Sequence, residues 1–416
     1  MNGGMPVRTR ALLFSLILLF ALPGGRAERV VDLSGPTPQP TAAPAPALLL
    51  SGAPLEVDPP VQLDCAAALL LEPESGQILF EMNADAPRAV ASVTKVMTIL
   101  LALEAVEQGR ASLEDGVPVS KNAAGMGGSQ VLLDTGETQP ASVLIKSCVV
   151  GSANDAAVAL AEWLYGSEEA FVRRMNERAG ELGMENTQFV NCTGLPAEGQ
   201  RTTARDVARM AAALFGHDLY FEYAGIWLDE VDHGDGRVTQ LTNTNRLIRL
   251  YDGCDGGKTG STKEAGYCLA ATARRGGMRL IAVVLGAPSG GERFDIAARM
   301  FDHGFANYRL YPVAARGARI RGGLPVTGGE AEAVPLQLDG ALTLLVRKGE
   351  EEGIELVPDL PASLAAPVAA GEAVGWVEVR RAGRVVARLP VVAAEAVAGR
   401  GWRPAFRRAI QAWGMW

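Results

Sequence analysis

The sequence predicts an α+β domain followed by a small all-β domain and a C-terminal amphipathic helix. Two strand-like segments precede a block from Pro140 to Leu214 that is mostly helical, and strand character returns after Gly266. Strands on either side of a helical block must pair with each other, which is the α+β arrangement. Beyond residue 310 the pattern changes to short apolar alternations with turn signals, which is typical of a β domain.

The composition fits a folded chain with more than one domain. At about 150 residues per domain, 416 residues suggest two or three domains, and 48% hydrophobic residues can bury a sizeable core. The formal charge of −8 argues against general nucleic-acid binding. Three scattered histidines and five cysteines without a Cys-x-x-Cys pair argue against HExxH-type metal sites, zinc ribbons and thioredoxin-like redox centres. No metal or cofactor is expected. Most of the cysteines are expected to be buried apolar residues, and the spacing leaves open whether one disulfide forms.

Residues 1–27 have the pattern of an export signal. Two arginines precede an apolar stretch from Ala11 to Leu22, which is too short for a comfortable membrane span, and small residues precede a cleavage position after Ala27. The alternative is an uncleaved N-terminal anchor. Residues 28–59 are rich in proline and alanine and predict an extended tether.

The first elements of the α+β domain, which is expected over residues 60–310, follow this tether. The segments Ala66 to Leu71 and Gln77 to Glu81 predict two strands joined by a tight turn. Val93 to Gln108 predicts a helix that is apolar on nearly every side, as in a buried central helix. Gly109 is expected to end that helix.

The later elements complete the predicted domain. Helices are expected over Asp155 to Leu164 and over Glu168 to Leu182. Tyr267 to Ala273 and Met278 to Leu285 flank a glycine-containing turn and predict a hairpin. Ile296 to Phe305 predicts a closing helix.

The C-terminal part predicts a small β domain over residues 311–397 and a helix over 398–416. A hairpin turn is expected around Gly383. On a helical wheel, one face of the tail is apolar and carries three tryptophans, whereas arginines occupy the other face. This pattern is typical of a helix lying in a membrane interface, and the segment is too short to span. The alternative is a helix packed back on its own domain.

The segment Ser92-Val93-Thr94-Lys95 is the first of three motifs that carry chemistry. Positions i and i+3 share a face of a helix, so Lys95 is placed to take the proton of the Ser92 hydroxyl and make it a nucleophile. Lys95 must be neutral to act as a base, and burial would lower its pKa. The motif alone is a weak signal because Ser-x-x-Lys occurs in many chains.

Two further motifs follow in order, and each has a plain structural alternative. Ser152-Ala153-Asn154 precedes a predicted helix, where serine and asparagine are also preferred as helix caps. Lys258-Thr259-Gly260 lies in a glycine-rich run, where glycine lets a ligand approach a strand edge closely. The alternative for this third motif is an ordinary turn before a strand.

Taken together, the three motifs resemble the set found in serine β-lactamases and penicillin-binding proteins. From about residue 60 to 310 the chain resembles the low-molecular-mass penicillin-binding D-alanyl-D-alanine carboxypeptidases of peptidase family S11. The β domain and amphipathic tail are also similar to that family's layout. The resemblance implies a serine β-lactamase/transpeptidase-like fold, an antiparallel sheet with a helical block. It extends to Asn83-Ala84-Asp85, Phe189 to Leu195 and Gly257 to Gly260.

The resemblance also implies roles for five side chains. Ser92 would attack the peptide carbonyl between two D-alanines and become acylated, with Lys95 as the base. Ser152 and Lys258 would help to pass a proton to the departing D-alanine. Asn154 would hold Lys95 and the substrate amide.

Oxyanion and substrate contacts follow from the same resemblance. The backbone N–H groups of Ser92 and Ser261 would form the oxyanion hole. Thr259 and Arg293 would take the terminal carboxylate, although Arg293 could instead be a surface charge. The implied substrate-binding residues are Lys258, Thr259, Gly260 and Arg293.

The implied partners are peptidoglycan stems ending in D-Ala-D-Ala, β-lactam antibiotics as inhibitors, and a membrane surface, without nucleic acid. Export would place the protein on the cell-wall side of the cytoplasmic membrane. A β-lactamase is one alternative, although no clear Glu-x-x-Leu-Asn run follows Ser152. A non-catalytic penicillin or cell-wall sensor is another, and it would not need a paired nucleophile and base. A transpeptidase is not excluded by the sequence.

Overall fold

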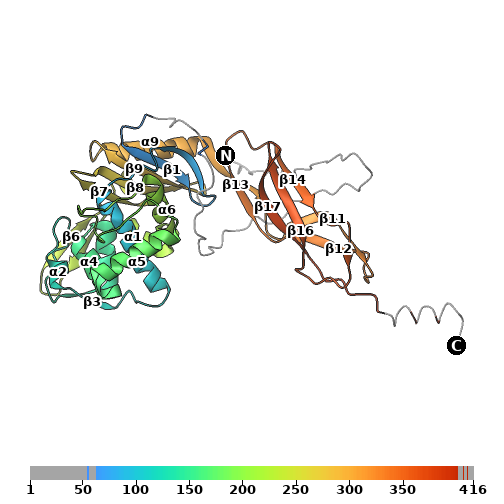
Figure 1. The fold of residues 1–416 in the computed structure, drawn as a ribbon, viewed down its shortest axis with the longest axis horizontal. Coiled ribbons are helices and arrows are strands. Elements are labelled where there is room, and N and C mark those ends of the chain that lie inside the picture. The colour runs from blue at the N-terminus through green and yellow to red at the C-terminus, as the bar shows by residue number, and fades with distance from the viewer. Residues whose placement is uncertain (1–53, 56–61, 402–405, 407–409, 411–416) are drawn as a thin grey trace, which may run out of the picture. The chain divides into compact units, whose positions relative to one another are not determined.

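The computed structural model describes residues 54–55, 62–401, 406 and 410. The predicted export signal lies outside the described residues, as do most of the predicted tether and most of the predicted C-terminal helix. The chain divides into two compact units after Arg309, and each is described by itself (Figure 1). No helix among the described residues is long and apolar enough to cross a membrane.

The first unit is built on a five-stranded antiparallel sheet with the strand order β2-β1-β9-β8-β7. The strands that open the unit pair with the strands that close it, as in the register of Leu69 with Val283. This pairing confirms the predicted α+β class and both predicted hairpins. The strands are β1 (Ala67–Glu72), β2 (Gln77–Met82), β7 (Cys254–Thr262), β8 (Gly266–Arg275) and β9 (Met278–Ala287).

Strand β1 is buried on both faces because helices cover both sides of the sheet. Leu69 and Leu71 belong to the core that the helical block shares. Leu70 faces the other way, toward α9, where a Cβ added to Gly304 would lie 3.2 Å from its side chain. Figure 1 shows α9 beside β9 and β1, with α6, α1 and α5 beyond the sheet. The sheet is therefore the middle layer of the unit.

The helical block contains the buried helix that the sequence predicts. Helix α1 is buried at every position from Lys95 to Ala105. The helix was expected to begin at Val93 but begins at Lys95, because Ala91–Thr94 form a 3-10 turn directly before it. The helices are α1 (Lys95–Glu107), α2 (Lys121–Ala124), α3 (Ala141–Val150), α4 (Asn154–Tyr165), α5 (Glu168–Glu181), α6 (Ala204–Leu214), α7 (Asp218–Ala224), α8 (Leu247–Leu250) and α9 (Glu292–Asn307).

Helix α9 begins four residues earlier than the predicted closing helix, at Glu292 rather than Ile296. The Ser289 hydroxyl accepts a hydrogen bond from the Glu292 N–H at 3.0 Å, and acidic residues in the first turn suit the positive end of a helix. Apolar periodicity alone missed this polar first turn. Two short antiparallel pairs also lie outside the main sheet: β3 (Gly116–Pro118) with β4 (Thr138–Pro140), and the hairpin of β5 (Leu228–Asp232) with β6 (Val238–Thr242).

The second unit is all-β over residues 310–401, as predicted. A six-stranded sheet has the order β14-β16-β17-β12-β11-β15, and β10 pairs with β13. The predicted turn lies between β16 and β17, where Ala382 and Gly383 both have positive φ. The strands are β10 (Tyr308–Ala314), β11 (Arg319–Thr327), β12 (Ala333–Leu338), β13 (Leu342–Arg347), β14 (Ile354–Asp359), β15 (Leu364–Ala365), β16 (Ala373–Arg381) and β17 (Arg384–Ala393).

Candidate active site

Ser92 lies in the 3-10 turn that leads into α1, and Lys95 is the first residue of that helix. The Lys95 Nζ lies 3.1 Å from the Ser92 Oγ. Ala91, directly before the serine, adopts the left-handed region with φ 49°, which is uncommon for a residue with a Cβ. Such backbone strain persists only where the surrounding structure imposes it, and it concentrates at functional sites.

The Lys95 amine is completely buried and has two acceptors besides Ser92. It donates to Asn154 Oδ1 at 2.5 Å and to the Thr193 carbonyl at 2.8 Å. Burial lowers the pKa of Lys95 to about 8 from its ordinary value of 10.5. A neutral amine that uses its two hydrogens on these acceptors directs its lone pair at the Ser92 hydroxyl. The arrangement can therefore remove the serine proton.

The Ser152-Ala153-Asn154 motif does not cap the helix that follows it. The cap position of α4 is Ala153, which makes no side-chain bond there, and Ser152 has a left-handed φ of 62°. The Ser152 Oγ instead accepts a hydrogen bond from the Lys258 Nζ at 2.7 Å. The helix-cap alternative is wrong, because both polar side chains of the motif turn toward buried lysines.

Lys258, Thr259 and Gly260 lie within β7, the edge strand of the sheet, so the alternative of a turn before a strand is also wrong. Lys258 is buried, and both burial and the charge of Lys95 lower its pKa. A Cβ added to Gly260 would lie 2.9 Å from the Ser92 N atom. Glycine at this position thus lets the strand edge approach the serine backbone closely.

The outer edge of β7 presents backbone N–H groups beside the serine. The Tyr220 hydroxyl accepts from the Gly257 N–H at 3.0 Å and donates to the Gly257 carbonyl at 3.3 Å, so these groups point away from β8. Backbone groups alternate along a strand in an antiparallel sheet, so the N–H groups of Thr259 and Ser261 point the same way. The predicted oxyanion donor at Ser261 therefore faces the outer edge.

Arg293 lies against the same strand and is not an isolated surface charge. Its Nη1 donates to the Gly260 carbonyl at 3.1 Å, and the guanidinium lies over the rings of Phe294 and Tyr267. Its Nε is buried without a hydrogen-bond partner. A buried donor without an acceptor costs free energy.

Sequence reasoning missed four contributors to this site. Thr193 acts through its backbone carbonyl, which residue type does not reveal. Thr244 accepts a hydrogen bond from the Thr259 hydroxyl at 2.8 Å, and Tyr220 fixes the Gly257 backbone. The charge of Arg246 contributes to the lowered pKa of Arg293, although burial is the larger cause. The one sequence feature that pointed to Thr193 is Gly194, which follows it. The structure explains this glycine, because an added Cβ there would lie 2.0 Å from the Ala91 carbonyl oxygen.

All five cysteines lie in the described part of the chain, and each is a free thiol. Four are buried, as expected, and Cys65 is half-buried. Burial raises the pKa of the Cys148 thiol to about 12, so this thiol near the two lysines is unreactive at neutral pH. Among the described residues no group of three or more histidine, cysteine or acidic side chains is placed to hold a metal ion.

Comparison with known proteins identifies the family of this chain. Residues 54–289 match peptidase family S11, whose members are described as D-alanyl-D-alanine carboxypeptidases. The chain belongs to this family. Residues 308–398 match the C-terminal domain of penicillin-binding protein 5.

This S11 carboxypeptidase is similar to its relatives over most of their length. The chain is 37% identical to the D-alanyl-D-alanine carboxypeptidase DacF of Bacillus subtilis, over 84% of this chain and 90% of the relative. It is 33% identical to DacC of Escherichia coli, over 85% and 90%. The structure of penicillin-binding protein 5 from Haemophilus influenzae matches with a TM-score of 0.71 and 29% identity, over 82% of this chain and all of that one. The protein is therefore a serine-type D-Ala-D-Ala carboxypeptidase, a hydrolase.

Proposed function

We propose that this S11 carboxypeptidase removes the terminal D-alanine from peptidoglycan pentapeptides through an acyl-enzyme on Ser92, and that penicillins acylate the same serine. The observation that supports the proposal is the Lys95 amine. It is buried, its pKa is lowered to about 8, and it lies 3.1 Å from the Ser92 Oγ. A non-catalytic sensor would not need this pairing of nucleophile and base.

In the proposed acylation, the Ser92 Oγ attacks the carbonyl carbon of the penultimate D-alanine and its proton passes to Lys95. The developing oxyanion accepts hydrogen bonds from the N–H groups of Ser92 and Ser261. Each such preorganised donor is worth about 3 kcal/mol in the transition state. The C–N bond then breaks and an ester links the peptide to Ser92.

The departing D-alanine needs a proton on its amine. The Ser152 hydroxyl can supply one and recover it from Lys258, whose Nζ lies 2.7 Å away. The positive charge of either lysine disfavours the charge of the other, so a neutral Lys95 favours a protonated Lys258. Lys95 then gives up the proton that it took from Ser92, and Lys258 regains one, each by exchange with water. The neutral Lys95 amine next takes a proton from the water that attacks the ester and returns it to the Ser92 oxygen as the ester C–O bond breaks.

Recognition of the free carboxylate accounts for carboxypeptidase rather than endopeptidase specificity. The proposed donors to this carboxylate are the Arg293 guanidinium, which lies beside Gly260, and the Thr259 hydroxyl, which would turn from Thr244 to donate to the substrate. An arginine can grip a carboxylate with two parallel hydrogen bonds. Lys258 and Gly260 complete the proposed substrate edge, along which the peptide lies beside β7.

The decisive experiment incubates the protein with a D-Ala-D-Ala pentapeptide and, separately, with a labelled penicillin. We expect release of one D-alanine per peptide and a covalent adduct that mass spectrometry maps to the peptide containing Ser92. Slow loss of the adduct distinguishes a carboxypeptidase from a β-lactamase, which releases it rapidly. An adduct mapped to any other residue would refute the proposed nucleophile.

We also propose export and attachment to the membrane surface on the cell-wall side. The export-signal pattern of residues 1–27 supports the first, and the tail 398–416 supports the second. Phe406 and Ile410, which lie on the predicted apolar face of the tail, are helical and exposed. Deleting residues 398–416 is expected to move the protein from the membrane fraction to the soluble fraction without loss of D-alanine release. Retention of the shortened chain on membranes would contradict the proposal.

A further inference from the structure

A loop from Gly127 to Leu133 holds the asparagine that contacts the catalytic lysine. The Asn154 backbone N–H donates to the Ser129 carbonyl at 2.7 Å. The Asn154 side chain donates through Nδ2 to the Gly127 carbonyl at 2.6 Å, while its Oδ1 accepts from Lys95. Displacing this loop would therefore move the Asn154 amide relative to the Lys95 amine.

The far end of this loop is strained and is held by hydrogen bonds. Leu132 adopts a left-handed φ of 63°, yet the residue is 60% exposed, so burial does not explain the conformation. The buried Asp155 carboxylate accepts from the N–H groups on both sides, Val131 at 3.1 Å and Leu133 at 3.2 Å. The Leu132 carbonyl between them accepts from Arg237 Nη1 at 3.1 Å. The loop is thus held by two side chains: Arg237 binds the Leu132 carbonyl, and Asp155, which follows Asn154, binds the N–H groups beside it.

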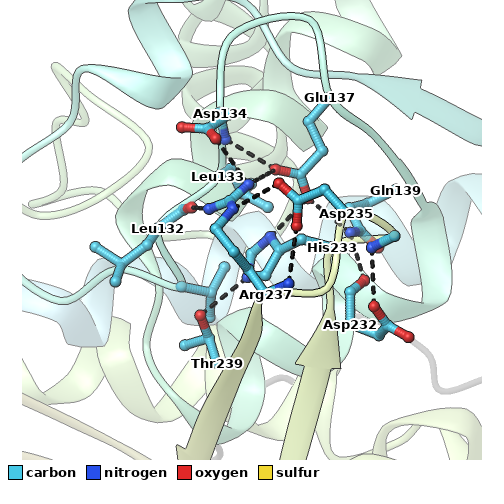
Figure 2. Close-up of polar contacts among 12 residues, drawn as sticks. Leu132, Leu133, Asp134, Glu137, Gln139, Asp232, His233, Asp235, Arg237 and Thr239 are labelled. Carbon is cyan, nitrogen blue, oxygen red and sulfur yellow. Dashed lines mark hydrogen bonds and ion pairs between the residues drawn. The ribbon is translucent and has the colours of Figure 1, made fainter.

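A polar cluster around Glu137 joins the segment that follows the loop to the turn of the β5–β6 hairpin, which contains His233 and Arg237 (Figure 2). The Glu137 side chain is only 7% exposed and lies 2.7 Å from the His233 Nδ1 and 3.4 Å from Arg237. It also accepts from Gln139 at 2.7 Å and from the Asp134 N–H at 2.9 Å. Although burial alone raises it, these donors hold the pKa of Glu137 below its usual range. The cluster therefore contains a charged carboxylate.

The same hairpin reaches the other wall of the active site. Strand β6 leads into Thr244, whose N–H donates to the Val150 carbonyl at 3.2 Å and whose hydroxyl accepts from Thr259 at 2.8 Å. The Glu137 cluster thus connects the loop that holds Asn154 with the β5–β6 hairpin. That hairpin leads to Thr244, which contacts the Lys258–Gly260 strand edge. The cluster joins segments 96 positions apart in the sequence, as in the Glu137–His233 contact.

We propose that Glu137, His233 and Arg237 are positioning residues for acyl transfer. They fix the Gly127–Leu133 loop and so keep the Asn154 amide in place against Lys95. The inference rests on the proposed acylation of Ser92. Misplacing a reacting group by about 1 Å can cost about a hundredfold in rate, so a small displacement of the loop is sufficient.

The chain offers a matched control for this cluster. His217 Nδ1 contacts Glu107 at 2.7 Å, the same distance as His233 to Glu137, but at the far end of α1 from Lys95. His233→Gln and His217→Gln therefore each break a His–Glu contact of the same length. The sites differ in burial, because the His233 side chain is fully buried and also lies 2.9 Å from Thr239 Oγ1, whereas the His217 side chain is 17% exposed. Arg237→Gln is the second test variant, because its side chain is 40% exposed and its loss leaves the core intact.

The experiment measures the rate of acylation by a fluorescent penicillin, the melting temperature, and hydrogen exchange at the Val131 and Leu133 amides. We expect His233→Gln and Arg237→Gln to slow maximal acylation about tenfold and to speed exchange at both amides. Arg237→Lys, which keeps the charge, should recover part of the rate. His217→Gln should leave the rate and the exchange at these amides unchanged.

Each other outcome has a defined meaning. Wild-type rates of acylation in both folded variants would overturn the inference, whether or not exchange at the loop had increased. An equal loss in His217→Gln would also overturn it, because the effect would then follow from general destabilisation. A wild-type protein that is not labelled at all would instead refute the proposed function.

Discussion

Ser92→Ala is expected to abolish both D-alanine release and the covalent penicillin adduct. We expect a loss of about 10⁴-fold or more in kcat, the range seen when a serine nucleophile is removed from a hydrolase. Within the described part of the chain no other hydroxyl is bonded to the Lys95 amine, since Ser152 Oγ pairs with Lys258 instead. Release of D-alanine by the purified variant, assayed over hours, measures the residual activity.

Ser167→Ala is a suitable control for this loss. The Ser167 Oγ accepts from the Ala170 N–H at 3.2 Å and caps α5, so its removal should cost about 1 kcal/mol of stability. Activity should be retained, because the cap makes no contact with the Ser92 site. A Ser92→Ala protein that still formed a stable adduct would place the nucleophile elsewhere.

Lys95→Met is the second variant for which we expect a large loss. Removing the base should reduce the acylation rate by about 10²- to 10⁴-fold, the usual contribution of general base catalysis. In the wild-type protein the neutral fraction of Lys95 grows as pH rises. The acylation rate should therefore increase with pH through about 8, the pKa of this amine, and the Met variant should lose this dependence. A wild-type profile that is flat between pH 7 and about 9 would contradict the role of Lys95 as base.

Lys95→Met should also change how the free energy of unfolding depends on pH. The folded-state pKa of Lys95 is about 8 and lies below its ordinary value of 10.5, so the folded protein binds this proton more weakly than the unfolded chain does. Burying the charged amine thus costs stability below pH 8, and the cost fades as pH rises toward 10.5. The free energy of unfolding of Lys95→Met minus that of the wild type should decrease across this window. Urea titrations at several pH values measure the difference.

Short-range patterns determined much of this protein. The spacing of Ser92 and Lys95 puts both on one face of a helical turn, because residues three positions apart in a helix are neighbours on its surface. The hairpin from β8 to β9 and the buried character of α1 likewise follow from turn residues and apolar periodicity. The resemblance of the three motifs was sufficient to name the family.

The tertiary structure decided which alternatives hold at each motif. Ser152 accepts from a lysine 106 positions away rather than capping its own helix, and Lys95 binds acceptors 59 and 98 positions away. The Thr193 carbonyl could not be predicted as an acceptor for Lys95, because every residue has a backbone carbonyl. The Glu137 cluster depends on a hairpin folding back on a distant loop. These partners are set by how the sheet and helices pack, because a hydrogen bond joins any donor and acceptor that the fold brings within about 3 Å, whatever their separation along the chain.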